Sequence, residues 1–248
     1  MGRGGDRQQD EQPGGGEPAP ARRRRGTPGP DERQWRGYGG PVRHDAGDPA
    51  PAPQVAVPLA REANDVLADA VRRHPHRFAA FATLPMYGPQ AAAAELERAV
   101  SGLGHAGAML FPRTGETFLD HADFRPGFEA AVHLGVPRYI HAAMRPRNLI
   151  DTAYSGFGVM TLRLILAGTL DRHPDLQIIL GHWGEMLVPF ADRAHLLSTA
   201  APHLQRRVLD YITGNLAVTA GGLHSHHMLG AAVDVLGPDR ITFGADCP

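Results

Sequence analysis

The sequence predicts an α/β fold in which a parallel sheet closes into a barrel. Strand-like and helix-like hydrophobic patterns alternate six times between residue 60 and the end of the chain, which is typical of strands joined by helical crossovers. Three predicted strands finish in side chains that bind metals, His141, His182 and Asp246. Ligands at several strand ends favour a barrel over an open doubly wound sheet. No Gly-rich dinucleotide fingerprint follows any strand, which argues against the open alternative.

Apolar residues are unevenly distributed along the 248 residues. Residues 1–52 hold no Leu, Ile or Phe and are rich in Gly, Pro, Arg and Ala, whereas apolar runs recur from Val55 onward. A segment of that composition does not bury enough apolar surface to offset its ordering entropy. We therefore expect a disordered segment over 1–52, which could equally be an artefact of the gene model because its residues have GC-rich codons. A folded domain is expected over 53–248.

Composition excludes several classes of chemistry. All 25 basic residues are arginine, so the chain has no Schiff-base lysine, P-loop lysine or carboxylated-lysine metal bridge. Its only cysteine, Cys247, excludes an intrachain disulfide and a Cys-rich zinc site. The net charge of −1 gives no argument for binding to nucleic acid or to a membrane surface, and no apolar run is long enough to span a bilayer. We expect a cytoplasmic protein.

The expected elements follow from hydrophobic periodicity and from Gly and Pro positions. Helices are expected at 60–73, 91–100, 124–134, 160–170, 208–212 and 228–236, with the first stopped by His74-Pro75. Strands are expected at 78–84, 106–111, 136–141, 177–181, 216–219 and 240–246.

The period of two in a strand sets which side chains share a face. Tyr139 and His141 are expected on the inward face of one strand. In the next strand, Q-I-I-L-G-H-W-G-E, we expect Ile178, Leu180 and His182 to point inward together. Both imidazoles would then face the same space.

Other polar residues beside these strands each allow a functional and a structural interpretation. Glu185, expected at the start of a helix, could hydrogen-bond the second nitrogen of a ligand histidine or simply suit a helix N-terminus. Arg145 and Arg147 could bind a substrate carboxylate or be solvated charges in a loop. The histidines of H-P-H at 74–76 and of H-S-H-H at 224–227 are interpreted as turn and helix-start residues rather than metal ligands.

Several motifs together resemble the amidohydrolase-2 family, and its decarboxylase branch in particular. They are A-N-D-V-L-A at 63–68, H-R-F-A-A-F-A-T-L-P at 76–85, L-R-L-I-L-A-G at 162–168, H-P-D-L-Q-I-I-L-G-H-W-G-E at 173–185 and D-R-I-T-F-G-A-D-C-P at 239–248. The branch includes decarboxylases of γ-resorcylate, 2,3-dihydroxybenzoate and aminocarboxymuconate semialdehyde. The resemblance implies a metal-dependent-hydrolase (β/α)8 TIM barrel with one divalent ion, Zn2+ or Mn2+, at the carboxyl ends of the strands.

The same resemblance implies roles for individual residues. His141, His182 and Asp246 match metal ligands of the family, and Asp246 also matches its proton-transfer group. Glu185 matches the glutamate of the G-H-x-G-E motif, and Asp246, His182 and Glu185 are the expected catalytic residues. The family's first strand carries E-x-H or H-x-H, which has no counterpart in residues 1–52. The barrel is therefore expected to be truncated at its N-terminal strands and after the last strand.

Three functions follow as alternatives. The first is a metal-dependent, non-oxidative decarboxylase, a carbon–carbon lyase acting on an aromatic or enol carboxylic acid. The second is a metal-dependent hydrolase of a lactone or amide in the same superfamily, and the third is a truncated, non-catalytic fragment. The expected partners are a small carboxylic acid substrate and further copies of the chain in a homo-oligomer, with no nucleic acid and no membrane.

Overall fold

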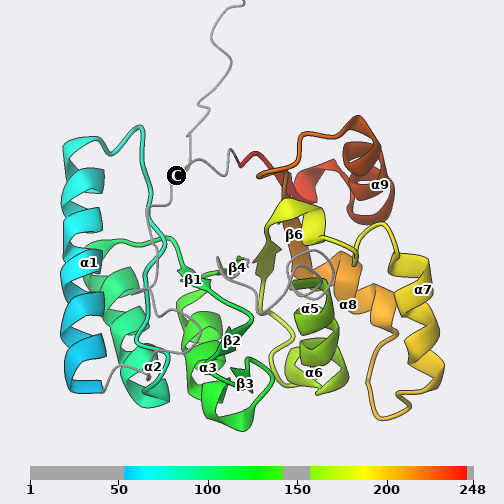
Figure 1. The fold of residues 1–248 in the computed structure, drawn as a ribbon, viewed down its shortest axis with the longest axis horizontal. Helices are drawn as coiled ribbons and strands as arrows, with labels where there is room; N and C mark the ends of the chain where they lie inside the picture. Colours follow the sequence, from blue (N-terminus) through cyan, green and yellow to red (C-terminus); the bar gives the residue numbers. More distant parts are fainter. Residues whose placement is uncertain (1–52, 142–156, 245–248) are drawn as a thin grey trace, which may run out of the picture. The chain divides into compact units, whose positions relative to one another are not determined.

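A five-stranded parallel sheet, in the order β1-β4-β5-β6-β7, is the central element of the structure (Figure 1). The computed structural model describes residues 53–141 and 157–244. Its parallel strands and intervening helices confirm the predicted α/β class. The five strands are β1 (Ala108–Leu110), β4 (Arg138–Ile140), β5 (Ile178–Leu180), β6 (Leu216–Thr219) and β7 (Ile241–Thr242).

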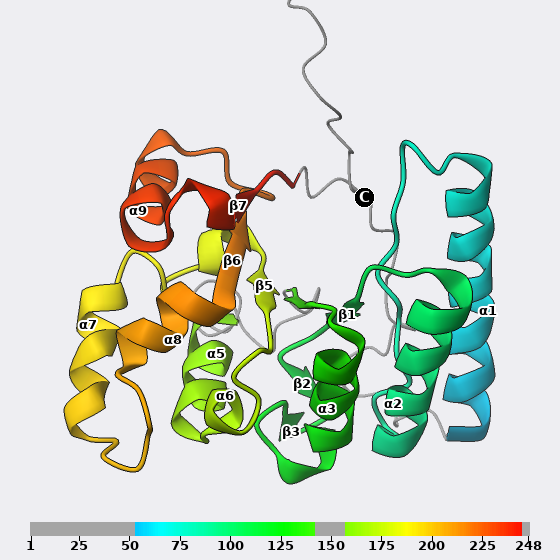
Figure 2. The same ribbon diagram turned by 180° about the vertical axis from the view of Figure 1, so that it is seen from behind.

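Helices connect the strands and pack beside them, with α2 and α3 near β1 and with α8 and α9 beside β6 (Figures 1 and 2). The helices are α1 (Pro53–Arg73), α2 (Pro89–Glu97), α3 (Arg125–Leu134), α5 (Phe157–Leu166), α6 (Thr169–Arg172), α7 (Ala191–His195), α8 (Val208–Asn215) and α9 (His226–Leu236). Shorter helical turns are η1 (Arg98–Gly102), η2 (Ala122–Phe124), η3 (His182–Gly184), η4 (Leu196–Thr199) and η5 (Pro238–Arg240).

Most predicted helices are present, and their ends follow local chemistry. The first ends at Arg73, before His74-Pro75, as predicted. The helix expected over 160–170 is instead two helices, α5 and α6, because Gly168 adopts a left-handed φ of 68° between them. Sequence patterns missed α7 and a small antiparallel hairpin of β2 (Arg113–Thr114) and β3 (Thr117–Phe118).

The strand predicted at 78–84 forms only one bridge, between Ala82 and Ala108. Its backbone nevertheless runs along β1, because Ala82 N donates to Gly107 O at 2.8 Å and Met109 N donates to Ala82 O at 3.0 Å. Gly107 is required at this crossing, since a Cβ there would lie 2.4 Å from the Pro137 carbonyl oxygen. The segment therefore extends the sheet beyond β1 without forming a regular strand.

The two faces of the sheet differ in burial. Ile140, Leu180 and Val218 lie on the face that packs against helices, which we call the helix face, and each is fully buried. Tyr139 and its register partner Ile179 lie on the opposite face, here called the open face, and both are only half-buried. The core of the described structure is therefore on the helix face.

The pairing register corrects one predicted orientation. Ile178 pairs with Arg138 and Leu180 with Ile140, so Ile178 and Leu180 point to the helix face and not inward as predicted. Ile179 is the β5 residue that shares the open face with Tyr139. The expected inward position of Tyr139 itself is consistent with this register.

Within the described residues, the central sheet has five paired strands and one further bridge. The parallel strands and the helices between them agree with the predicted α/β class. No helix within the described ranges combines the length and apolar character that crossing a membrane requires.

A buried polar network fastens α1 to the sheet edge. The Asn64 side chain donates to Thr83 O at 3.0 Å and to Glu95 Oε1 at 2.7 Å, and its carbonyl oxygen accepts from Thr83 N at 2.9 Å. Burial acts to raise the pKa of Glu95, but hydrogen bonds from Arg98 and Asn64 and the charges of Arg98 and Arg61 outweigh burial and hold that pKa below its usual value. The ionised carboxylate is thus part of the packed interface between α1 and α2.

His105 makes the folded state sensitive to acid. It is 4% exposed, and its Nε2 has no hydrogen-bond partner. Burial, and then the charge of Arg98, lowers the pKa of His105, and burial lowers the pKa of His173 in the same direction. Both histidines therefore bind a proton more readily in the unfolded chain than in the folded chain. Stability then rises with pH in the range where histidines titrate.

We expect the free energy of unfolding to fall as pH is lowered from about 7.5 to 5.5, because the histidine pKa in the unfolded chain is about 6.5. His105→Gln should reduce this pH dependence, whereas His74→Gln, at an exposed position, should preserve it. Urea denaturation at several pH values measures the effect. An equal pH dependence in both variants would contradict the assignment to His105.

Candidate active site

The carboxyl ends of β4 and β5 bring His141 and His182 together. The strands pair in parallel register from Arg138 and Ile178 to Ile140 and Leu180, so both chains leave the sheet at the same edge. The two imidazole rings lie with centroids 5.2 Å apart and planes inclined by 55°. Both side chains are half-buried. The sequence prediction that these two histidines face one space agrees with the structure.

His182 reaches this position through an unusual backbone turn. Strand alternation places Ile179 on the open face, so the strand period alone would put Gly181 there and His182 opposite. Instead φ is 48° at His182, 60° at Trp183 and 50° at Glu185, all left-handed values at residues other than glycine. Such conformations are strained by about 1–3 kcal/mol each and persist where surrounding contacts hold them. The turn η3 redirects the imidazole toward His141.

Trp183 anchors the strained turn. Its side chain is 3% exposed and its indole N–H donates to the Leu223 carbonyl oxygen at 2.5 Å. Backbone hydrogen bonds from Gly184 N to Gly181 O, at 2.8 Å, and from Glu185 N to His182 O, at 2.9 Å, close the turn. Burial and these bonds offset the backbone strain.

Tyr139 connects the histidines to neighbouring parts of the open face. Its ring lies 5.8 Å from that of His141 and 5.8 Å from that of Phe81, and its hydroxyl lies 3.5 Å from Thr219 Oγ1 on β6. Gly181 is adjacent, because a Cβ there would contact the Tyr139 hydroxyl at 3.4 Å and His141 Cδ2 at 3.5 Å. A Cβ at Gly181 would thus make ordinary contacts with both rings, whereas a longer side chain there would enter the space between them.

Of the other predicted site residues, the structure describes only Glu185. Glu185 does not start a helix; it ends η3, and its side chain lines a surface groove of about 320 Å³ between α5 and α7. Arg145, Arg147 and Asp246 lie outside the described residues. Within the described ranges, no third His, Cys, Asp or Glu joins His141 and His182 in a metal-binding group. Sequence reasoning did not single out Tyr139, Gly181 or Trp183 as site residues, although the motif around His182 contains two of them.

Comparisons with known proteins find a matching family profile, similar sequences and similar structures. The Amidohydrolase family profile matches residues 11–248. The chain is 36% identical over 222 residues to γ-resorcylate decarboxylase of Rhizobium radiobacter, an alignment that covers 78% of this chain and 66% of that relative. The chain thus spans slightly less than two thirds of that relative's length.

Two solved structures show the same fold. A 2,6-dihydroxybenzoate decarboxylase in complex with 2,6-dihydroxybenzoate superposes with a TM-score of 0.72 at 34% identity, over 80% of this chain and 68% of that chain. The 5-carboxyvanillate decarboxylase of Novosphingobium aromaticivorans, in complex with manganese and 4-hydroxy-3-methoxy-5-nitrobenzoic acid, superposes with a TM-score of 0.75 at 31% identity, over 81% and 63% of the two chains.

We expect Trp183→Phe to lower the free energy of unfolding by about 1–2 kcal/mol, because it keeps an aromatic ring but removes the buried indole N–H that donates to the part-buried Leu223 carbonyl. Leu223→Ala is the matched control: it leaves the accepting carbonyl in place at a half-exposed position and should change stability by less than about 0.5 kcal/mol. Urea denaturation followed by circular dichroism measures both. Equal effects would show that the hydrogen bond does not hold the turn.

Proposed function

Because the chain belongs to the amidohydrolase family, we propose that it is a metal-dependent, non-oxidative decarboxylase of an aromatic or enol carboxylic acid. One observation carries the proposal: His141 and His182 meet at the carboxyl ends of adjacent parallel strands, where barrel enzymes place their chemistry. Relatives at 31–36% identity are decarboxylases of hydroxylated aromatic acids, which supports this substrate class.

The two imidazoles fit a shared metal ion. With a metal–nitrogen distance of about 2.1 Å and a ring radius of about 1.1 Å, two histidines on one tetrahedral ion have ring centres about 5 Å apart. The observed 5.2 Å agrees with this value. We propose His141, His182 and Asp246 as ligands of one divalent ion. Manganese in the carboxyvanillate enzyme favours Mn2+, with Zn2+ as the alternative.

The proposed reaction replaces the carboxylate on a ring carbon by a proton. An ion held by these residues would supply Lewis acidity toward the oxygens of the substrate. Asp246 donates a proton to the ring carbon that bears the carboxylate. The bond to the carboxylate then breaks, CO2 leaves, and the electron pair of that bond restores the aromatic ring. Arg145 and Arg147 are proposed to bind the carboxylate through charged hydrogen bonds before it departs.

Glu185 and Tyr139 are assigned supporting roles. The G-H-x-G-E motif places Glu185 three residues from His182, and we propose that it hydrogen-bonds or exchanges a proton with the ring nitrogen that is not on the ion. The Tyr139 ring contacts the rings of Phe81 and His141 and is proposed to hold the His141 imidazole in its orientation.

A second candidate is a metal-dependent hydrolase of a lactone or amide, which the name of the matching family favours. There Asp246 would accept a proton from the attacking water instead of donating one to carbon. Release of CO2 without consumption of water distinguishes decarboxylation from hydrolysis.

We further propose a homo-oligomer in the cytoplasm. The single cysteine suits a reducing compartment. Light scattering after size-exclusion chromatography measures the oligomeric state.

Metal content tests the proposed site. Chain purified without added metal should contain close to one Mn2+ or Zn2+ per molecule, and His182→Ala should lose it because one of three protein ligands is removed. Elemental analysis measures both proteins, and release of CO2 from 2,6-dihydroxybenzoate tests the activity. His227→Ala, on exposed α9, controls for loss of a histidine. Equal metal content in the unsubstituted chain and in His182→Ala would contradict the ligand assignment.

Substitution of Gly181 tests the geometry. Gly181→Leu should place a side chain between Tyr139 and His141 and weaken Mn2+ affinity by about 10–100-fold, the range seen when groups that orient metal ligands are disturbed. Gly181→Ala should retain affinity, because its Cβ would meet both rings at ordinary contact distances of 3.4 and 3.5 Å. Isothermal titration calorimetry measures the affinities, and unchanged binding in Gly181→Leu would argue against this orientation of His141.

A further inference from the structure

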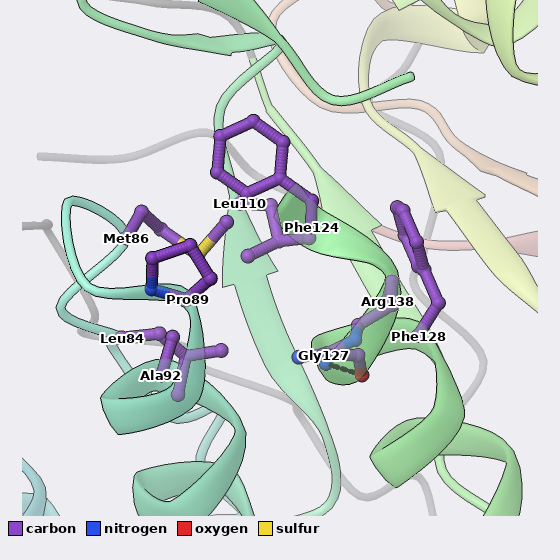
Figure 3. Close-up of a pocket in the computed structure, with 9 residues that line it drawn as sticks. All are labelled: Leu84, Met86, Pro89, Ala92, Leu110, Phe124, Gly127, Phe128 and Arg138. Carbon is purple, nitrogen blue, oxygen red and sulfur yellow. Dashed lines mark hydrogen bonds between the residues drawn. The ribbon is translucent and has the colours of Figure 1, made fainter. Parts of the chain in front are cut away.

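The surface groove between α5 and α7 is wide enough to receive side chains of another molecule. Its volume is about 320 Å³, and most of its walls are apolar, with Leu162, Met186 and Leu197 among the lining residues. The cavity beside the buried Arg138 side chain, between α2, α3 and β1, has by contrast a volume of only about 10 Å³ (Figure 3). The groove is therefore the better candidate for an interaction site.

Large apolar side chains of the groove are left in contact with solvent. Val159, Met186 and Phe190 all line it and are exposed, and Phe190 has 51% of its surface accessible. Removal of apolar surface from water is the main favourable term in protein association. Neighbouring exposed apolar side chains in a hollow are typical of an interaction site, whereas single exposed ones are ordinary.

Two side chains of opposite charge, Glu185 and Arg193, line the same groove. Arg193 is exposed on α7 and forms no ion pair with another residue in the described parts of the chain. In a two-fold symmetric pair, a surface patch meets the same patch of the other copy. A patch that carries one charge of each sign can therefore pair both charges reciprocally.

The order of the lining residues along the chain suits such a pair. Phe190 lies between Glu185 and Arg193 in the segment that forms one wall of the groove. A two-fold axis near Phe190 would bring Arg193 of each copy to Glu185 of the other, with the two aromatic rings at the centre. Aromatic and arginine side chains are the residues that most often dominate binding energy at the centre of interfaces.

The groove is continuous with the turn that carries His182. Gly158 of α5 lies against the backbone after this turn, because a Cβ at Gly158 would be 3.2 Å from Leu187 N and 3.4 Å from the Gly184 carbonyl oxygen. Glu185 ends the turn itself. A carboxylate has two oxygens, so Glu185 can accept from a second copy as well as from a ring nitrogen.

We propose that this groove is the interface of a two-fold symmetric dimer of the chain, in which Arg193 of each copy pairs with Glu185 of the other. The inference rests on the homo-oligomer proposed above and names the surface through which it forms. A second copy fits better than a partner of one charge sign, because the groove carries both signs. Two-fold dimers are also the commonest closed oligomers of soluble proteins.

Sedimentation velocity of surface variants tests the interface. The unsubstituted chain should dimerise, and Phe190→Glu should weaken the dimer by about 100-fold or more, because a carboxylate replaces the central ring in both copies. Arg193→Glu should weaken it by about 10–100-fold, because it places like charges opposite each other. Val66→Glu, at a 60% exposed position of α1, is the matched control and should leave dimerisation unchanged.

The outcomes separate this interface from the homo-oligomer itself. A dimer that persists in Phe190→Glu or in Arg193→Glu, or that dissociates equally in Val66→Glu, would overturn the assignment of the groove and leave the oligomer in place. A monomer at every protein concentration would overturn both. Metal content reports separately on His141 and His182 in either case.

Cross-linking tests the two-fold geometry by the gain of a covalent dimer. Cys247 is the only cysteine of the chain, so Cys247→Ser provides a background without thiols. Phe190→Cys in this background should form a disulfide-linked dimer on mild oxidation, because an axis near residue 190 brings its two copies within disulfide reach, about 4.4–6.8 Å between Cα atoms. Val66→Cys should remain monomeric on denaturing gels. No cross-linked dimer of Phe190→Cys would overturn the two-fold arrangement.

Discussion

The parallel register of β4 and β5 is the constraint on which the candidate site depends. Pairing of Arg138 with Ile178 and of Ile140 with Leu180 makes both strands end at one edge, so residues that follow them start from neighbouring positions. His141 directly follows β4, whereas His182 is separated from β5 by Gly181. A slip of one residue in this register would reverse the faces of β5 and carry His182 away from His141. Packing of Leu180 and Ile140 on the buried helix face opposes that slip, so the hydrophobic core itself positions the imidazoles.

The turn after β5 shows how the fold sustains a strained backbone. Left-handed φ values at His182, Trp183 and Glu185 are unfavourable in isolation, and only Gly184 in this run tolerates such a value without strain. The buried indole of Trp183 and its bond to Leu223 hold the turn against relaxation. The turn places His182 beside His141, which is consistent with a functional origin for the strain. Relaxation toward an ordinary extended conformation would point His182 to the other face of the sheet.

Sequence patterns predicted the parts of the fold that depend on local periodicity. The strand at Leu216–Thr219 has its predicted limits, and the first helix ends before Pro75, because alternation and proline act within a few residues. The inward orientation assigned to Leu180 was wrong, since strand period tells which residues share a face but not which face packs against helices. Nearness of His141 and His182 was predicted correctly, although the left-handed turn that produces it has no sequence signal beyond Gly184. The predicted roles of Asp246 and of the residues before 53 concern positions that the structure does not describe.

Residue type alone does not predict the burial of Arg138, because arginine is normally solvent-exposed. Strand alternation nevertheless leaves it no alternative: Tyr139 and His141 must share the open face, so Arg138 must share the helix face with Ile140. The chain therefore buries a charge as a consequence of placing its imidazole. Moving that charge to solvent would require β4 to shift by one residue, which would also remove His141 from His182. The burial of the Arg138 charge and the geometry of the candidate site are thus linked through the register of a single strand.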